Sequence, residues 1–371
     1  MRIAINTRHP FADHDPFRSD PIYASISRLA EKHPQDQFVY LFEGPFDSNL
    51  ITSPGITGIS VQAPAFFRAG YERRLAALMS SGKTNLLLNT RGICLMRASI
   101  PQILFLQDLV DIDHPRLLTR KQVIYYKKYM PRFLEKATMI CTPSEYSKNI
   151  IAAKYKISTD KIKVLYPVAG VLFSPLDEKS KERVKEKYAG GREYYLFSGS
   201  IEPRNDLIGL LKAFSLFKKR QKTNMLLLLV GKVGRGYEEL AVKLKTFKFR
   251  SEVKLLEPLS PPDLAAITAA AYGFLYPSLY DGQAIALLEA MQCGVPLIAY
   301  AAGSIPEICG EAAIYAETGN VTDLAEKMML LFKDENGQKE LIRKGQLRSG
   351  QFNSGIADDL LWQSILQCSL L

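Results

Sequence analysis

Hydrophobic positions along the chain follow two alternating patterns. Short apolar runs rich in β-branched or aromatic residues alternate with longer segments in which apolar residues recur at helical spacing. This alternation is typical of parallel β-sheets covered by helices. In the N-terminal half it predicts strands near residues 2–6, 38–42, 84–88, 102–106, 138–142 and 162–166, and helices over 21–33, 71–81, 120–136 and 144–156.

A second series of strands follows a segment of different character. Residues 169–192 lack a clear strand and contain a charged run and the pair Gly190-Gly191, which suits a connection between domains. Beyond this segment, strands are expected at 194–198 and near 225–230, 253–256, 273–276 and 296–300. The sequence thus predicts an α/β protein with two doubly wound, Rossmann-like domains over 1–168 and 193–350, followed by 351–371.

Composition places the chain among globular proteins with anionic partners. It has 371 residues, of which 47% are hydrophobic and 23% charged, and 48 Lys and Arg against 38 Asp and Glu give a net charge of +10. Such a charge favours phosphates, nucleotides, acidic lipid surfaces or nucleic acid, without choosing among them.

Cysteine usage and hydropathy bear on the compartment. The five cysteines are widely spaced and odd in number, so neither a disulfide framework nor a metal knuckle is indicated, and a reducing cytoplasm is the expected location. Residues 1–6 read as a first strand rather than as a secretory signal. The longest mostly apolar stretch, 264–276, is too short to cross a bilayer, so any membrane contact would be peripheral.

The loop after the strand that ends at Tyr276 carries the strongest candidate chemistry. Asp281 lies in this loop, and Glu289 follows after seven intervening residues in the next helix, which Gly294 and Pro296 end. Free N–H groups at the helix start, near Gly282, could face a diphosphate, and either carboxylate could accept several charge-assisted hydrogen bonds. Taken singly, Asp281 would be interpreted as a turn residue and Glu289 as a solvated acid.

A second candidate lies after the strand that ends at Ser198. Arg204 is a cation in this loop, and Asn205 and Asp206 are favoured helix N-cap residues before an amphipathic run. Lys232, in a glycine-rich turn after the following strand, offers a further cation, although such a turn is weak evidence by itself.

Both segments resemble the signature of glycosyltransferase family 4, the retaining group 1 glycosyl transferases of GT-B fold. In that family a loop acid, seven residues and a helical Glu precede Ala-Met-x-Cys-Gly-x-Pro, here residues 290–296. The family's Glu-Pro-Arg-Lys-Asn loop corresponds here to Glu202-Pro203-Arg204-Asn205-Asp206. Weaker likenesses at 34–38, 106–109, 137–148 and 256–264 extend the resemblance over most of the chain.

The resemblance implies roles for individual residues. Glu289 should hold the ribose hydroxyls of a nucleotide, Asp281 should lie near the donor sugar, and Arg204 should neutralise the diphosphate, with Lys232 as a substitute cation. The resemblance also implies that the C-terminal helix within 351–371 returns to the first domain. The other implied donor-binding residues are Gly199, Asn205, Gly282, Gln283 and Ala284, and the implied acceptor-side residues are Gln107, Asp108 and Ser144.

By resemblance the reaction is a metal-independent, retaining transfer of a sugar from a UDP- or GDP-linked donor to a saccharide or lipid-linked acceptor, in polysaccharide or glycolipid synthesis. The nucleotide-sugar is a substrate, so no cofactor is expected. A short Asp111-Ile112-Asp113 pattern resembles the metal-binding motif of the other major glycosyltransferase fold, but such patterns arise easily by chance.

Several positions depart from the family pattern. The glycine-rich loop usual after the first strand is replaced by residues 8–16, which contain no glycine, and Gln107, Asn205 and Asp281 stand where relatives have His, Lys and Glu. A catalytically weakened or inactive relative that binds a nucleotide, sugar or partner protein is therefore the alternative. We expect His9 and His14 to be exposed loop residues rather than substitutes for the missing groups.

The helical segment around 116–136 has Glu135 as its lone acid and places three tyrosines, Tyr125, Tyr126 and Tyr129, beside many cations. The cations are Arg116, Arg120, Lys121, Lys127, Lys128, Arg132 and Lys136. The face of this segment could rest on an anionic membrane surface, or it could simply be solvated. Nucleic-acid binding is disfavoured, because the chain lacks a recognisable binding module or an aromatic-basic stacking motif.

Overall fold

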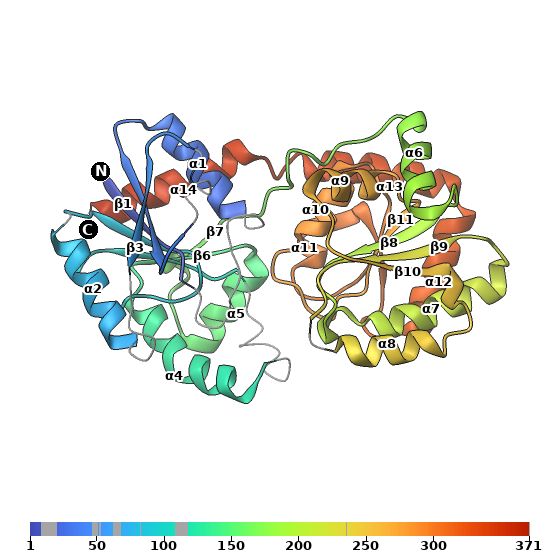
Figure 1. Cartoon of the computed structure of the whole chain (residues 1–371), viewed down its shortest axis with the longest axis horizontal. Helices are drawn as coiled ribbons and strands as arrows, with labels where there is room; N and C mark the ends of the chain where they lie inside the picture. Colours follow the sequence, from blue (N-terminus) through green and yellow to red (C-terminus); the bar gives the residue numbers. More distant parts are fainter. Residues whose placement is uncertain are drawn as a thin grey trace. The chain divides into compact units, whose positions relative to one another are not determined.

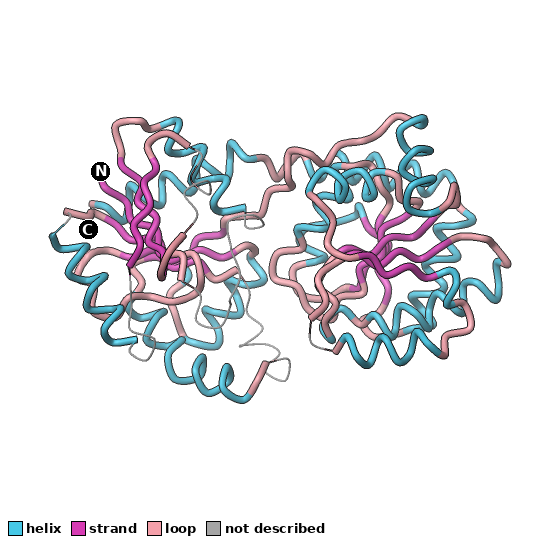
Figure 2. Tube along the Cα trace, viewed as in Figure 1, coloured by secondary structure: helices cyan, strands magenta, loops and turns pink. Residues whose placement is uncertain are grey.

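The computed structural model describes residues 1–8, 21–46, 51, 53–61, 68–81, 83–107, 118–234 and 236–370. The chain divides into two compact units, each an α/β unit built on its own parallel sheet (Figures 1 and 2). Unit 1 comprises Met1–Pro167 and Ser354–Leu371, and unit 2 comprises Val168–Asn353. The predicted fold class, an α/β protein with two Rossmann-like halves, is confirmed.

Unit 1 contains a parallel sheet with the strand order β3-β2-β1-β4-β5-β6-β7. The order reverses between β1 and β4, as in doubly wound folds. Its strands are β1 (Arg2–Asn6), β2 (Gln37–Glu43), β3 (Ile56–Val61), β4 (Leu86–Asn89), β5 (Gln102–Phe105), β6 (Met139–Thr142) and β7 (Ile162–Val164). Its helices are α1 (Pro21–Lys32), α2 (Arg68–Ser81), α4 (Arg120–Lys136), α5 (Glu145–Tyr155), the 3-10 turn η3 (Thr159–Lys161) and α14 (Ser354–Ser369).

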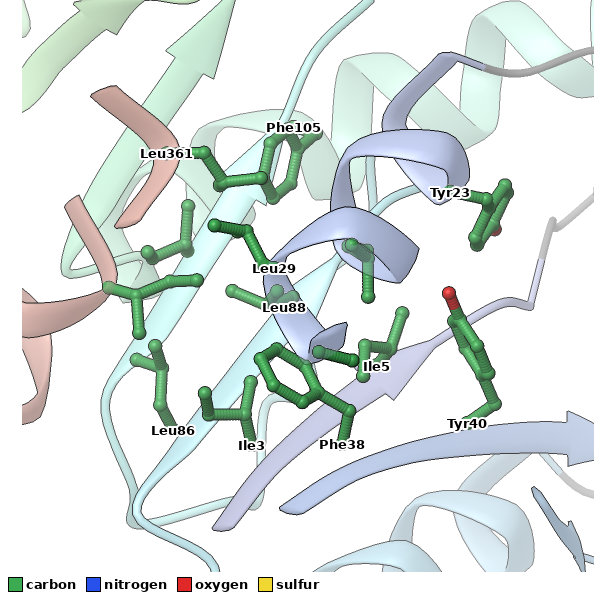
Figure 3. Close-up of a cluster of buried hydrophobic side chains, with 14 of the residues drawn as sticks. Ile3, Ile5, Tyr23, Leu29, Phe38, Tyr40, Leu86, Leu88, Phe105 and Leu361 are labelled. Carbon is green, nitrogen blue, oxygen red and sulfur yellow. The ribbon is translucent and has the colours of Figure 1, made fainter. Parts of the chain in front are cut away.

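Alternation along the strands divides the core of unit 1 between the two faces of the sheet. Ile3 and Ile5 of β1 belong to one buried cluster, whereas Ala4 belongs to another, since successive side chains of a strand point to opposite faces. Figure 3 shows the first cluster, in which Leu361 of α14 lies next to Phe105 of β5. The C-terminal helix is therefore part of the core of unit 1.

Polar contacts also attach α14 to α1. The carboxylate of Asp358, which is 1% exposed, accepts hydrogen bonds from Nε and Nη2 of Arg28 at 2.8 and 2.9 Å. The ring of Trp362 stacks on that of His33 with centroids 3.7 Å apart. A buried carboxylate held by a two-point arginine contact fixes the helix in one orientation.

Unit 2 has the strand order β10-β9-β8-β11-β12-β13, again with parallel pairing and a reversal, here between β8 and β11. Its strands are β8 (Tyr194–Ser198), β9 (Leu226–Val230), β10 (Val253–Leu256), β11 (Gly273–Tyr276), β12 (Leu297–Tyr300) and β13 (Ala313–Ala316). Its α-helices are α6 (Glu178–Ala189), α7 (Leu207–Gln221), α8 (Tyr237–Lys245), α9 (Pro261–Ala269), α10 (Ile285–Gln292), α11 (Ile305–Cys309), α12 (Val321–Lys333) and α13 (Glu335–Ser349). The 3-10 turns are η4 (Pro203–Asn205), η5 (Arg250–Glu252) and η6 (Gly310–Ala312).

The segment 169–192, expected as a connection, belongs to unit 2 and contains helix α6. Asp177 caps this helix by accepting from the N–H of Ser180, and Gly190 ends it in the left-handed conformation. The charged residues of the segment thus lie mainly on an exposed helix.

None of the helices in the described part of the chain has the length and apolar character that crossing a membrane would require.

Candidate functional site

Most of the predicted donor residues of unit 2, Glu289 excepted, lie in the loops that follow the carboxyl ends of β8, β9 and β11. This is the edge at which doubly wound sheets bind ligands, and the reversal of strand order lies between β8 and β11. The backbone N–H of Leu279, in the loop after β11, donates to the carbonyl of Arg204, in the loop after β8, at 2.7 Å. The two loops that carry the candidate residues are therefore in direct contact.

Close backbone approach joins the loops after β8 and β9. A Cβ atom on Gly231, whose φ is +153°, would lie 1.9 Å from the carbonyl oxygen of Gly199, so only glycine fits there. The N–H of Ile201 donates to the carbonyl of Lys232 at 2.9 Å, while the Lys232 side chain is exposed. Lys232 is thus anchored by its backbone and leaves its ammonium group at the surface of unit 2.

The Arg204 loop is shaped by its two neighbours. Asn205 is 3% exposed, and its Nδ2 donates to the carbonyl of Ser200 at 2.6 Å. Its Oδ1 and the hydroxyl of Ser200 are buried without a hydrogen-bond partner among the described residues. Asp206 adopts the left-handed conformation, and its carboxylate accepts from the N–H of Gly209 at 3.0 Å, capping α7. Asn205 therefore fills the interior of the loop rather than presenting a substitute for a lysine side chain.

Arg204 is half-buried, and its Nε lies 3.4 Å from the carboxylate of Glu202. The guanidinium is always charged, and its planar N–H groups match the geometry of phosphate oxygens. Arg204 therefore combines a defined position with the capacity to contact a diphosphate.

The structure directs the Asp281 carboxylate into its own loop. Oδ1 accepts from the N–H groups of Gln283 at 2.8 Å and of Ala284 at 3.0 Å, and Oδ2 accepts from the hydroxyl of Tyr276. Ala284 is the N-cap of α10 and lies in the left-handed region, with φ +53°. In this arrangement Asp281 satisfies N–H groups at the start of α10 that we expected to face a diphosphate, and it orders the loop that includes Gly282.

Glu289 lies in the middle of α10 and is half-buried. Burial raises the pKa of its carboxyl group from 4.5 to about 8, and a hydrogen bond from the backbone N–H of Gly170 partly opposes this change. Nearby, Nε2 of Gln292 donates to the carbonyl of Phe173 at 2.7 Å. Helix α10 is therefore attached to the segment that begins unit 2.

The acceptor-side residues of unit 1 have different environments. Ser144 is 0% exposed, and its hydroxyl accepts from the N–H of Ser147 at 3.2 Å as the N-cap of α5. Gln107 is half-buried at the end of the described stretch after β5. The structure thus gives Ser144 a capping role and no exposed surface. Asp108, the Asp111–Asp113 pattern, His9 and His14 lie outside the described residues.

Two residues that contact the candidate acids were not singled out from sequence. Tyr276 is the last residue of β11, and its hydroxyl reaches back to Asp281, which five-residue spacing alone does not reveal. Gly170 is remote from Glu289 in the sequence, and a backbone N–H donor cannot be predicted from a pattern of side chains.

Comparison with known proteins identifies unit 2. Residues 178–348 match the family model described as Glycosyl transferases group 1. The O-antigen chain mannosyltransferase B of Escherichia coli is 27% identical over 249 residues, covering 66% of this chain and 65% of that protein. The serotype-specific mannosyltransferase WbdA of Escherichia coli is 25% identical over 233 residues, covering 62% of this chain and 28% of that protein.

Solved structures extend the likeness to the whole fold. Alr3699/HepE from Anabaena, solved in complex with UDP and glucose, superposes with a TM-score of 0.78 at 15% identity, covering 99% of this chain and 100% of that one. At such low identity the superposition supports the fold alone. The chain therefore has the two-domain GT-B fold, and its residues 178–348 form a domain of the group 1 glycosyl transferase family.

Proposed function

We propose that the protein is a retaining mannosyltransferase that transfers the sugar from a nucleotide-linked donor to a saccharide or lipid-linked acceptor during surface polysaccharide synthesis. The group 1 match over residues 178–348 carries this proposal, because it covers both loops that meet at the carboxyl ends of β8 and β11. The mannosyltransferase relatives favour mannose as the donor sugar.

The donor nucleotide is proposed to bind along the carboxyl edge of the unit 2 sheet. In this proposal Glu289, on α10, accepts hydrogen bonds from the ribose hydroxyls. Arg204 and the exposed Lys232 neutralise the charge of the diphosphate. The buried Oδ1 of Asn205 and hydroxyl of Ser200, which have no hydrogen-bond partner among the described residues, lie in the same loop as Arg204, which supports a ligand site there.

In the proposed reaction the acceptor hydroxyl attacks the anomeric carbon on the face that the diphosphate leaves. The departing diphosphate takes the acceptor proton, and the protein stabilises the charge that develops on it. We propose that Arg204, with Lys232, supplies this stabilisation and that neither a metal ion nor a cofactor takes part. Asp281 acts by positioning the loop 277–284 through its bonds to Tyr276, Gln283 and Ala284.

A second candidate function is nucleotide binding without transfer. The observation that favours it is the inward orientation of Asp281, whose carboxylate oxygens both accept hydrogen bonds within the protein. Under this alternative the nucleotide site is intact but no group contacts the donor sugar strongly enough for turnover.

The test is release of nucleoside diphosphate from GDP-mannose and UDP-mannose by the full chain, with and without lipid-linked saccharide acceptors. Arg204→Ala should lower the rate by about a hundredfold, the typical effect of removing one donor to developing negative charge. Arg343→Ala is the matched control, because Arg343 is also paired with a glutamate but lies on α13. Binding without release would favour the second candidate, and an unchanged Arg204→Ala rate would contradict the proposed role.

A further inference from the structure

Helix α4 of unit 1 has an inner face that packs on its own unit and an outer face that carries an unusual set of side chains. Met130, Phe133 and Leu134 are buried on the inner side. The outer face is defined by the exposed residues of the helix, which recur at helical spacing. They are Arg120, Lys121, Ile124, Lys127, Lys128, Pro131, Arg132 and Glu135.

Charge on this outer face is almost entirely positive. Five of its eight residues are Lys or Arg, and Glu135, in the last turn, is its one acid. None of these five cations forms an ion pair with another residue in the described ranges. Helix α6 differs in kind, since its cations alternate with Glu178, Glu182 and Glu186. The outer face of α4 is therefore complementary to an extended anionic surface.

An aliphatic side chain stands among the cations. Ile124 is 68% exposed, and helical spacing places Lys121, Lys127 and Lys128 one turn to either side of it. A cationic face with one exposed aliphatic residue can rest on an anionic membrane surface, with the aliphatic group toward the headgroups and the cations at the phosphates.

The aromatic residues of α4 also favour a bilayer over a nucleic acid. Tyr125, Tyr126 and Tyr129 are half-buried, and the ring of Tyr125 packs against those of Tyr126 and Tyr129 at centroid distances of 5.5 and 5.0 Å. Rings packed on each other do not form the open platform on which unpaired bases stack.

We propose that the outer face of α4 is a docking surface for an anionic lipid bilayer. The surface is independent of the proposed transfer reaction, because it lies on unit 1 and uses none of the candidate donor residues. It would hold the protein at a membrane whose headgroups carry net negative charge.

The experiment is co-sedimentation of the full chain with phosphatidylcholine vesicles, with and without phosphatidylglycerol. We expect binding only to the anionic vesicles and release at high salt, where charge interactions are screened. Lys127→Glu combined with Lys128→Glu should weaken partitioning by more than about tenfold, since each cation contributes about fivefold near an anionic surface.

Helix α8 provides matched controls. It has the exposed residues Val242, Lys243 and Lys245, so Lys243→Glu with Lys245→Glu produces the same change in net charge on unit 2. This pair should leave partitioning within about twofold of the unchanged protein, whereas Ile124→Ala should weaken it and Val242→Ala should not. All these side chains are exposed, so thermal melts should remain unchanged.

Three results would overturn the proposal. They are absence of binding to anionic vesicles, equal loss from the α4 and α8 charge reversals, and retention of single-stranded oligonucleotides without binding to vesicles. Equal loss would mean that the net charge of +10 attracts the vesicles without a defined surface. Oligonucleotide retention alone would assign the cations to nucleic acid instead.

Discussion

The Asp281 carboxylate shows how one residue changes the interpretation of a motif. The resemblance to family 4 implied that Asp281 lies near the donor sugar, but its carboxylate accepts hydrogen bonds from Tyr276, Gln283 and Ala284. An aspartate is one methylene shorter than glutamate, so it can close a tight turn over its own following N–H groups. Asp281, which occupies the loop-acid position of the family motif, therefore orders its own loop in this chain.

Tyr276→Phe tests this positioning role. The substitution removes one hydroxyl that donates to Asp281 and keeps the ring, which stacks at 6.2 Å on Phe197. If Asp281 acts by ordering its loop, Tyr276→Phe should weaken nucleotide binding by about threefold to tenfold, less than the full loss of one hydrogen bond to a charged group, because the bond acts on the nucleotide only through the loop. Calorimetric titration measures this, with Tyr315→Phe, whose hydroxyl donates to Gly310, as the matched control. Unchanged affinity in Tyr276→Phe would show that the loop needs no such anchor.

Glu289 makes both stability and binding depend on pH. Its folded-state pKa is raised from 4.5 to about 8 by burial, so between these values the folded chain holds a proton that the unfolded chain has lost. The contribution of Glu289 to the free energy of unfolding is therefore largest below pH 4.5 and decreases as the pH rises toward 8. We expect the urea midpoint of unfolding to decrease between pH 4.5 and 8 in the unchanged protein. Glu289→Gln has no charge to gain, so its midpoint should decrease less over the same range.

Nucleotide binding should depend on pH in the opposite sense. Ribose hydroxyls donate to the ionised carboxylate, so affinity should rise as the pH increases through about 8 in the unchanged protein and stay flat in Glu289→Gln. Calorimetric titrations at several pH values measure this. Parallel pH profiles in the two proteins would exclude Glu289 from the nucleotide site.

At the scale of elements, helix α14 joins the end of the chain to unit 1. Asp358→Ala removes the buried partner of Arg28 and should destabilise unit 1 by about 3 kcal/mol, the lower part of the range for breaking a buried ion pair, since Arg28 is partly exposed. Urea denaturation measures the loss. The neighbouring Asp359 is exposed, so Asp359→Ala should change stability by less than about 0.5 kcal/mol. Equal effects would mean that hydrophobic packing alone attaches α14.

In the described part of the chain, strand prediction found every strand except one edge strand of each sheet. The residues 253–256 and 273–276 are strands with the predicted bounds. Strands β3 and β13 were not predicted, because β3 contains Gly58 and Ser60 and β13 is a four-residue segment with two alanines. Both are edge strands, but so are β7 and β10, which were predicted. The small and polar residues of β3 and β13, rather than their edge position, therefore account for the weak hydrophobic signal.

At the scale of the whole molecule, the two-domain α/β architecture could be predicted because each sheet repeats the same alternation of buried strand and amphipathic helix. Contacts between residues that are far apart in the sequence could not be predicted. The bond from Gly170 to Glu289 and the contact between Leu279 and Arg204 depend on how distant loops meet, which no local pattern encodes. The candidate residues were thus predictable by type, and their partners were not.

The central claim is that the carboxyl edge of the unit 2 sheet binds the nucleotide of a sugar donor. The most direct test is calorimetric titration of the full chain with GDP and UDP, compared with Glu289→Ala and with Glu326→Ala, an exposed acid on α12. We predict that one nucleotide binds the unchanged protein and the Glu326→Ala variant equally, and that Glu289→Ala loses about tenfold or more in affinity. Equal binding by both variants, or no binding of either nucleotide to the unchanged protein, would contradict the account.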